Sequence, residues 1–284
     1  MASSLLAWLG DSDKTTMLFD THCHLDVPVF DEDRDAVFAR AHDAGVTLFL
    51  NPAYDLESSR RAVTLAQSRE DVVAAVGVHP NDAEAFDETT IHDLRNMVIG
   101  SRPPHPNPLP FGEREPICAI GEIGLDYHWK TVSPDRQAGA FIAQLHLARE
   151  LDLPVIIHCR DAYDDCLDIL REHGRELSLV MHSFAGKLHH LHAALDFGYF
   201  IGVGGPVTYP NALTLRDCVQ VAPLDRIVIE TDAPYLAPQA VRGKRNEPAN
   251  VRAVAEKIAD VRQMSFEDVA NITMDNGKRL FGLK

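Results

Sequence analysis

The sequence has few cysteines and no long apolar stretch. Its five cysteines are an odd number and form no C-x-x-C pair, which argues against a disulfide framework and favours reduced thiols in a cytoplasmic protein. No run approaches the roughly 20 apolar residues of a membrane-spanning helix. The short apolar run at residues 5–9 has no basic segment before it, so we expect neither a signal peptide nor a membrane partner.

Positive charge is also scarce. The chain has 27 Lys and Arg against 42 Asp and Glu, a formal net charge of −15. This balance excludes a protein that coats nucleic acid through bulk charge. It still permits an enzyme that meets nucleic acid through metal ions and a local basic cluster. The length of 284 residues suits one large α/β barrel or two small domains.

Eight short apolar runs rich in Val, Ile and Leu alternate with longer, partly amphipathic segments. Runs of this kind are typical of parallel strands buried on both faces. Eight strand–helix repeats predict a single-domain α/β fold, the closed TIM (β/α)8 barrel. A doubly wound sheet is the alternative, disfavoured because such sheets usually gather their ligands at one crevice. The predicted strands lie near residues 18–20, 46–50, 73–78, 117–121, 155–158, 179–182, 199–203 and 227–231.

Two segments fall outside this pattern. We expect residues 1–16 to be a disordered extension, or the product of an over-extended start with Met17 as the natural first residue. Residues 101–115 contain five prolines and little apolar content, so they predict an exposed insertion before the fourth strand. A segment that precedes a strand lies on the barrel face opposite the chemistry. The barrel itself is assigned to residues 17–284.

Residues of metal-ligand type follow five of the predicted strands. His22 and His24 form an H-x-H pair, and alternate residues of a strand share a face, so both imidazoles can reach one ion. Ligands at the carboxyl ends of several strands are the layout of a TIM-barrel active site. Imidazole with carboxylate suits Zn²⁺ or Mn²⁺, and carboxylate with water suits Mg²⁺. The predicted ligands are His22, His24, Glu122, His158, His182 and Asp232.

These ligands divide into two predicted sites. Glu122 is expected to bridge two divalent ions, with His22, His24 and Asp232 completing one site. His158 and His182 complete the other. Ions of this kind activate water as a nucleophile, and Asp232 can take the proton of that water while it also touches a metal. Asp232 and Glu122 are therefore the predicted catalytic residues, with two ions of Mg²⁺, Mn²⁺ or Zn²⁺ as cofactors.

Eight motifs resemble the TatD family of metal-dependent deoxyribonucleases, in the expected order over roughly residues 17–284. The resemblance implies a TIM barrel of the amidohydrolase-like superfamily and a divalent-metal nuclease. It carries ligand roles onto the same six residues. The N-terminal extension and the proline-rich insertion depart from the family pattern, but neither touches a ligand motif. The motifs span residues 19–26, 77–80, 120–127, 154–160, 182–186, 204–208, 230–236 and 242–248.

Two basic features are candidates for binding phosphate. Arg160 follows His158 by two residues and would share its face, and a guanidinium binds phosphate in a bidentate manner. An ion pair with Asp161 or Asp164 is the alternative. Arg245 belongs to a basic loop at residues 242–245, near where TIM barrels often bind phosphate. The alternative there is a solvated loop.

Aromatic residues near the predicted site have two interpretations as well. Tyr127 and His128 follow Glu122 and could stack on a base or line the mouth of the barrel, while a packing role for Tyr127 is the alternative. His79 lies at a strand end and could contact substrate or the groups around the ligands. We do not predict it as a ligand, because six other residues already fill two sites.

Three functions remain open from the sequence. The resemblance implies a metal-dependent deoxyribonuclease, most plausibly a 3′→5′ exonuclease that acts on single-stranded DNA. The same scaffold could hydrolyse an amide, ester or lactone, including a D-aminoacyl-tRNA. A non-catalytic metal-binding partner protein is disfavoured because Asp232 is retained. Binuclear amidohydrolases often bridge their metals with a modified Lys, and Glu122 at this position favours the nuclease. Fold alone decides none of these, and the oligomeric state stays open.

Overall fold

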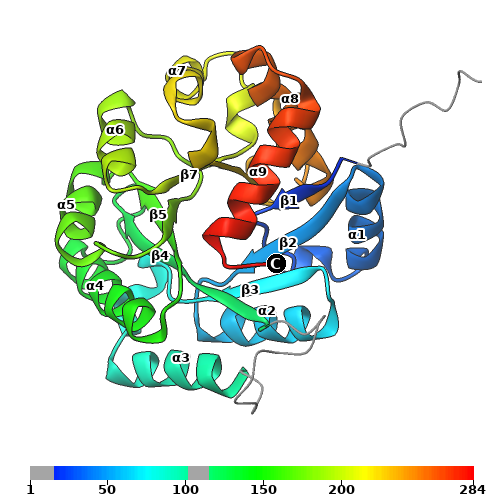
Figure 1. Cartoon of the computed structure of the whole chain (residues 1–284). Helices are drawn as coiled ribbons and strands as arrows, with labels where there is room; N and C mark the ends of the chain where they lie inside the picture. The colour runs from blue at the N-terminus through cyan, green and yellow to red at the C-terminus, as the bar shows by residue number, and fades with distance from the viewer. Residues whose placement is uncertain (1–15, 102–114) are drawn as a thin grey trace, which may run out of the picture.

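The computed structural model describes residues 16–101 and 115–284. Eight parallel strands form one sheet in chain order. The last strand meets the first where Thr21 N donates to Ile229 O at 3.1 Å and Cys23 pairs with Ala233 as a parallel bridge. The predicted TIM barrel is confirmed (Figure 1). The strands are β1 (Leu18–Asp20), β2 (Val46–Pro52), β3 (Val72–Val76), β4 (Ile117–Asp126), β5 (Val155–Arg160), β6 (Leu179–Met181), β7 (Phe200–Val203) and β8 (Ile227–Ile229).

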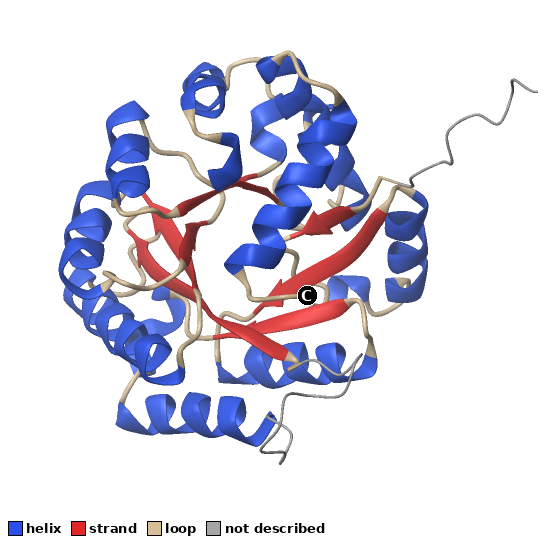
Figure 2. Ribbon diagram, in the orientation of Figure 1, coloured by secondary structure: helices blue, strands red, loops and turns tan. Residues whose placement is uncertain are grey.

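Helices surround the sheet on its outer side (Figure 2). The longest begins after Ser133, whose hydroxyl accepts a hydrogen bond from Arg136 N, and Pro134 supplies the fixed φ of a first helical residue. The short 3-10 helix η2 (Pro80–Ala85) follows β3, and His79 is its N-cap. The α-helices are α1 (Arg34–Asp43), α2 (Leu56–Ser68), α3 (Glu88–Ser101), α4 (Pro134–Leu151), α5 (Tyr163–His173), α6 (Leu188–Asp196), α7 (Leu213–Val221), α8 (Val251–Arg262) and α9 (Phe266–Leu280).

Strand alternation divides the core into two layers. In β3, Val72, Ala74 and Val76 pack in the layer beneath the helices, whereas Val73 and Ala75 face the barrel interior. In the longer strands β4 and β5, the interior apolar residues Cys118, Ala119 and Ile156 lie near the amino ends. The interior layer is therefore apolar at the amino ends of these strands and leaves the carboxyl ends for polar residues.

The C-terminal segment of the chain closes the apolar end of the barrel. Leu280 and Phe281 are buried in the interior layer, and the ring of Phe281 meets that of Phe19 edge-on, with centroids 6.1 Å apart. Figure 1 shows the C terminus lying over the middle of the sheet. Any chemistry must therefore occur at the opposite end.

The same alternation positions β5. Ile156 faces the interior and Ile157 the helices, so His158 and Arg160 project inward and towards the mouth. Gly124 of β4 pairs with His158. A side chain at Gly124 would collide with the His158 carbonyl oxygen, and the φ of 142° is also one that glycine adopts most readily. This close approach brings β4 beside the His158 ring.

The two segments predicted to lie outside the barrel pattern cannot be compared with the structure. The predicted extension and the proline-rich insertion fall almost wholly on residues 1–15 and 102–114, which lie outside the described residues, so both stay predictions. Within the described residues, no helix is long and apolar enough to cross a membrane. All five cysteines are free and buried.

Candidate metal centre

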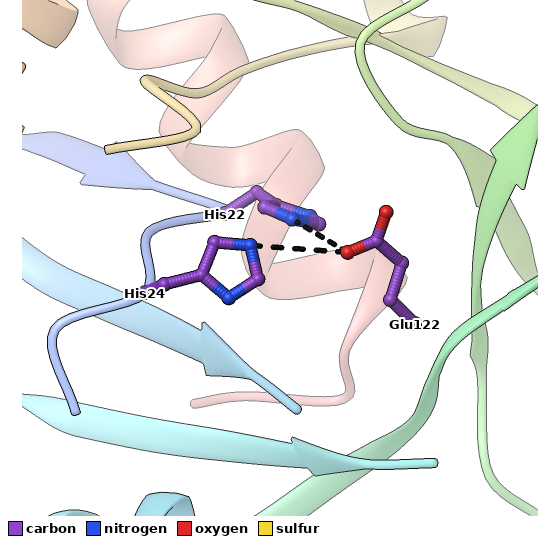
Figure 3. A group of neighbouring side chains, drawn as sticks. All are labelled: His22, His24 and Glu122. Carbon is purple, nitrogen blue, oxygen red and sulfur yellow. Dashed lines mark ion pairs between the residues drawn. The ribbon is translucent and has the colours of Figure 1, made fainter. Parts of the chain in front are cut away.

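Glu122 lies inside β4 and turns its two carboxylate oxygens towards different histidines. Oε2 lies 3.4 Å from Nε2 of His22 and 3.8 Å from Nε2 of His24. Figure 3 shows both contacts ending on this oxygen, while the other oxygen points away from the two rings. Oε1 lies 2.7 Å from Nδ1 of His158 and 2.8 Å from Nε2 of His182. Such an arrangement suits a carboxylate between two cation positions.

Asp232 completes the first of these positions. Its Oδ1 lies 3.6 Å from Nε2 of His22 and 3.5 Å from Nε2 of His24. Each of these two imidazole nitrogens thus lies 3.4–3.8 Å from Oε2 of Glu122 and from Oδ1 of Asp232. A tetrahedral ion with metal–ligand bonds of about 2.0–2.1 Å places its ligands roughly 3.3 Å apart. The donor spacing is therefore close to what one ion requires.

Hydrogen bonds at the outer nitrogens of two histidines fix which nitrogen faces the centre. His24 Nδ1 lies 3.2 Å from the carbonyl oxygen of Pro52, and His158 Nε2 lies 3.0 Å from Asp126 Oδ2. An oxygen acceptor at one nitrogen places the imidazole proton there and leaves a lone pair on the other. The inner lone pairs of both rings therefore face carboxylate oxygens. A cation or a proton must lie between them.

The inner nitrogens of His182 and His22 likewise require a cation or a proton beside them. His182 Nδ1 lies 3.5 Å from Glu230 Oε1, which leaves its Nε2 facing Glu122. The His22 side chain is fully buried, and neither of its ring nitrogens has a hydrogen-bond partner among the described residues. A buried polar atom without a partner costs free energy. Divalent cations would satisfy the inner nitrogens of these rings and the oxygens that face them, so the residues present fit a binuclear metal site.

Electrostatics keep the carboxylates ionised. Burial alone would raise the pKa of Glu122, but the imidazoles of His182, His22 and His158 hold that pKa well below its usual range. Burial likewise opposes ionisation of Asp232, yet the hydrogen bond with His24 and the charges of nearby histidines lower its pKa. Burial lowers the pKa of His22. Charged oxygens and a neutral imidazole are the forms that bind metal.

A buried aspartate joins the two strands that supply this first group. Asp20 accepts hydrogen bonds from Thr231 N at 2.9 Å, from Thr231 Oγ1 at 2.6 Å and from His22 N at 3.3 Å. Burial raises its pKa to about 8 against the opposing effect of these bonds. Asp232 N then donates to His22 O at 2.8 Å. The end of β8 is thereby held against the segment that carries the H-x-H pair.

Comparison with known proteins agrees with this geometry. A family model described as TatD related DNase matches residues 19–282. The chain belongs to the TatD-related DNase family. It is 39% identical to the uncharacterized metal-dependent hydrolase YabD of Bacillus subtilis, with 93% of this chain and 99% of YabD covered. It is 34% identical to the 3'-5' ssDNA/RNA exonuclease TatD of Shigella flexneri, with 94% of this chain and 99% of that protein covered.

A solved structure extends the agreement to the whole barrel. The crystal structure of YjjV, a TatD homolog from Escherichia coli K12, matches with a TM-score of 0.86 and 31% identity, covering 95% of this chain and 100% of YjjV. The family resemblance seen in the motifs is thus confirmed. This TatD-family chain is a metal-dependent hydrolase.

The structure brings all six predicted ligands of the TatD-family chain together, and it adds carboxylates that the sequence analysis missed. Asp126 contacts His158 and accepts backbone hydrogen bonds from His128 at 2.9 Å and Trp129 at 3.1 Å. Strand alternation from Glu122 would have placed Asp126 on the same face. The predicted fourth strand stopped at residue 121 because Gly and acidic residues interrupt its apolar run, whereas β4 continues to Asp126.

Glu230 is the other addition, and His79, already a candidate from the sequence, lies beside the same site. Glu230 accepts from Ser183 N at 2.5 Å and fits beside Gly202, where a Cβ would lie 2.5 Å from its Oε2. His79 Nε2 lies 3.8 Å from Glu122 Oε1, and its ring is 4.3 Å from that of His158 between centroids. Burial, with the charge of His158, lowers the pKa of His79 to about 3. His79 was left as a possible substrate contact in the sequence analysis.

The predicted substrate-binding residues occupy different environments. Arg160 is exposed at the end of β5, with its guanidinium 5.8 Å from the Trp129 ring, and no carboxylate among the described residues forms an ion pair with it. Tyr127 donates its hydroxyl to Asp165 at 2.8 Å and packs against the core. Its pKa is raised to about 12, by burial and then by Asp165. These contacts favour the packing alternative for Tyr127.

Arg245 is already engaged. Its Nη1 and Nη2 bind the two oxygens of Asp33 at 2.9 and 2.7 Å. Nη1 also donates to Val29 O at 2.7 Å, and the guanidinium stacks over Phe30 at 4.6 Å from the centroid. The residue therefore holds its loop to η1 (Pro28–Phe30) and the start of α1. Its predicted contact with substrate would require these bonds to be exchanged.

Proposed function

We propose that this metal-dependent hydrolase is a nuclease that removes nucleotides from the 3′ ends of single-stranded DNA. The observation that carries the proposal is the pair of histidine groups on the two oxygens of Glu122, with Arg160, which forms no ion pair with any described residue, exposed at the mouth of the same barrel. The name of the Shigella relative, a 3'-5' ssDNA/RNA exonuclease, supports the same class of substrate. A cytoplasmic location stays a prediction from the reduced cysteines.

Each ligand has a place in the proposal. One divalent ion would be held by His22, His24 and Asp232. The other would be held by His158 and His182, and Glu122 would be a ligand of both. Ions of Mg²⁺, Mn²⁺ or Zn²⁺, when bound, lower the pKa of water and neutralise charge on a phosphate. The fixed hydrogen bonds at the outer nitrogens of His24 and His158 keep their inner lone pairs aimed at the centre. The site is thus preorganised by protein contacts.

Asp232 is the proposed acceptor of the proton from the attacking water. Its side chain is 13% exposed, compared with 6% for Glu122, so a water molecule can approach it from the mouth. Its lowered pKa keeps it ionised at neutral pH. A base must lie within hydrogen-bond reach of the proton that it takes, and this carboxylate lies beside both histidines of the first group.

Burial of the site supports the proposed preference for single-stranded ends. The side chains of His22, His24 and His182 are at most 7% exposed, so a scissile phosphate must enter the mouth to reach them. A nucleotide in a duplex must first unstack and unpair, which costs a few kcal/mol. Arg160 can bind a phosphate at the mouth, and the neighbouring Trp129, 53% exposed, offers a ring on which a base can stack.

Digestion of end-labelled oligonucleotides tests the proposal. With Mn²⁺, we expect mononucleotides from single strands, with the 3′ label lost first, slower cleavage of blunt duplex, and no reaction with excess chelator. RNA and a p-nitrophenyl ester serve as comparison substrates. Arg160→Ala should impair cleavage of DNA more than hydrolysis of the ester. Faster internal cutting of circular single strands would contradict the end-directed model.

The ester arm distinguishes the alternative function. Turnover of an ester or amide, with DNA untouched in Mg²⁺, Mn²⁺ and Zn²⁺, would replace the nuclease with an amide or ester hydrolase. A D-aminoacyl-tRNA would then be the next substrate to test. The same metal site would serve that reaction, because ions that activate water can attack either a phosphoryl or a carbonyl group.

A further inference from the structure

His79 stands apart from the other histidines that face Glu122. It follows β3 and is anchored by its backbone, since His79 N donates to Tyr54 O at 2.8 Å. Its Nε2 lies 3.8 Å from Glu122 Oε1. By distance alone, His79, Glu122 and His158 could form a third set of metal ligands. The hydrogen bond at its other nitrogen decides between that role and a different one.

The outer nitrogen of His79 accepts a hydrogen bond. His79 is the N-cap of η2, and its Nδ1 receives the backbone N–H of Asn81 at 3.1 Å. Pro80 has no N–H, so the amide of Asn81 is the first donor of this turn and has no acceptor within the turn. Because the Nδ1 lone pair is used by that amide, a neutral imidazole carries its proton on Nε2.

The ring of His79 carries its proton on the nitrogen that faces the site, whereas the rings of His24 and His158 carry theirs on the outer nitrogen. Those rings bind an oxygen acceptor at the outer nitrogen and aim a lone pair inward, whereas His79 aims an N–H inward. A nitrogen that carries a proton has no lone pair for a metal. His79 is therefore suited to donate a hydrogen bond within the site and unsuited to bind an ion.

The inward N–H has no acceptor of its own. The separation of 3.8 Å from Glu122 Oε1 exceeds a hydrogen bond, and no hydrogen bond among the described residues uses His79 Nε2. The side chain is 12% exposed, close to the 13% of Asp232 and the 16% of His158. The donor thus lies on the open side of the site, where a substrate enters.

We propose that His79 Nε2–H donates a hydrogen bond to a non-bridging oxygen of the scissile phosphate, which makes His79 a catalytic residue. This inference rests on the proposed phosphodiester substrate. A neutral donor fixed at the place where negative charge develops stabilises the transition state without prior reorganisation. The backbone bond from Asn81 supplies that fixation by holding both the ring and its tautomer.

Two amide substitutions test the roles of the two nitrogens of this ring separately. His79→Asn keeps an acceptor for the Asn81 amide and removes the inner donor. His79→Gln can extend an N–H to the position of Nε2. We would measure Mn²⁺ stoichiometry and affinity by calorimetry, the affinity of the Mn²⁺-loaded protein for inorganic phosphate, kcat on a single-stranded oligonucleotide, and the melting temperature, all on the full chain.

We expect His79→Asn to bind Mn²⁺ as the wild type does, while its phosphate affinity falls about ten-fold or more and its kcat falls about 10²–10³-fold. His79→Gln should recover part of both losses. Loss of a bound ion in a folded His79→Asn protein would overturn the inference by making His79 a ligand. Unchanged phosphate affinity, or no binding of phosphate to the wild type, would also overturn it. Weakened phosphate binding in a protein that never cuts DNA would support the donor and refute the nuclease.

Discussion

Asp126 Oδ2 lies 3.0 Å from Nε2 of His158 and thereby decides which nitrogen of that imidazole faces the metal centre. The other oxygen of Asp126 is held by the backbone N–H groups of His128 and Trp129. The carboxylate therefore cannot turn away from His158 without losing two hydrogen bonds. Outer partners of this kind orient ligands and raise their basicity, and they typically change metal affinity 10–100-fold.

Asp126→Asn should weaken metal binding at the group that contains His158. The oxygen of the new amide would stay with the two backbone N–H groups, so its nitrogen would face His158 Nε2 and impose the wrong tautomer. We expect the affinity for the more weakly bound Mn²⁺ to fall about 10–100-fold, measured by calorimetry. Asp161→Asn is the matched control, because Asp161 is exposed and pairs with His128, which is not among the predicted ligands. Equal Mn²⁺ affinities in both variants would contradict this role for Asp126.

Metal binding should release protons near neutral pH. Burial lowers the pKa of His158, but Asp126 and Glu122 outweigh it and raise that pKa above 6.5 in the protein without metal. The charge of Glu122 does the same for His182 against its burial. A metal ion must displace these protons, so the affinity of the protein for Mn²⁺ should rise with pH near neutrality. Calorimetry in buffers of different ionisation enthalpy measures the protons released. Zero release at pH 7 would show that these imidazoles are already neutral.

Asp20 should make the fold less stable as pH rises. An unfolded Asp loses its proton near pH 4, whereas burial raises the pKa of folded Asp20 to about 8. Between these values the folded state holds more protons, so the free energy of unfolding falls as pH rises, and this loss is complete above about pH 8. Asp20→Asn should therefore show a shallower decline in melting temperature from pH 5 to pH 8 than the wild type shows.

Asp33→Asn is the control for this titration. Hydrogen bonds from Arg245 lower the pKa of the half-buried Asp33 to about 2, so its carboxylate stays charged throughout the same range. Its substitution should shift the melting temperature by the same amount at pH 5 and pH 8. If Asp20→Asn also gave parallel curves, the raised pKa of Asp20 would be wrong.

Phe281→Ala should destabilise the barrel without changing its chemistry. The ring is 4% exposed and fills the apolar end of the interior beside Phe19. Removal of a buried phenyl ring costs about 3–5 kcal/mol of unfolding free energy, which denaturant titration would measure. Leu213→Ala, at a side chain that is 65% exposed, should change stability little. Loss of metal binding in folded Phe281→Ala would show that the two ends of the barrel are coupled.

The sequence predicted the barrel and the six residues that meet at its mouth because both follow from local patterns. Apolar runs identify strands, and the carboxyl ends of parallel strands in a barrel converge. His158 and Asp232 could therefore be placed near Glu122 without knowledge of any contact. The matches to YjjV and to the TatD family confirm the fold, while the role of each ligand stays a proposal.

What the sequence could not supply were contacts that depend on tertiary structure. Arg245 was a candidate for phosphate, but Asp33 lies 212 residues earlier in the chain, and nothing in the basic loop indicates that ion pair. The length of β4 was missed because glycine and charge interrupt its apolar pattern. His79 could be placed near the site, yet its tautomer depends on a single backbone bond from Asn81.

The proposed hydrolysis depends most on Glu122 holding two ions that act together. The most direct measurement is a Mn²⁺ titration of chelator-treated full-length protein, with bound ions per chain and hydrolysis of a single-stranded oligonucleotide followed in the same samples. We predict two bound ions in the wild type, with hydrolysis rising only as the second binds, and both fewer ions and little hydrolysis in Glu122→Gln. Full hydrolysis with one bound ion, or a Glu122→Gln protein that binds two ions and stays active, would contradict this two-ion role of Glu122.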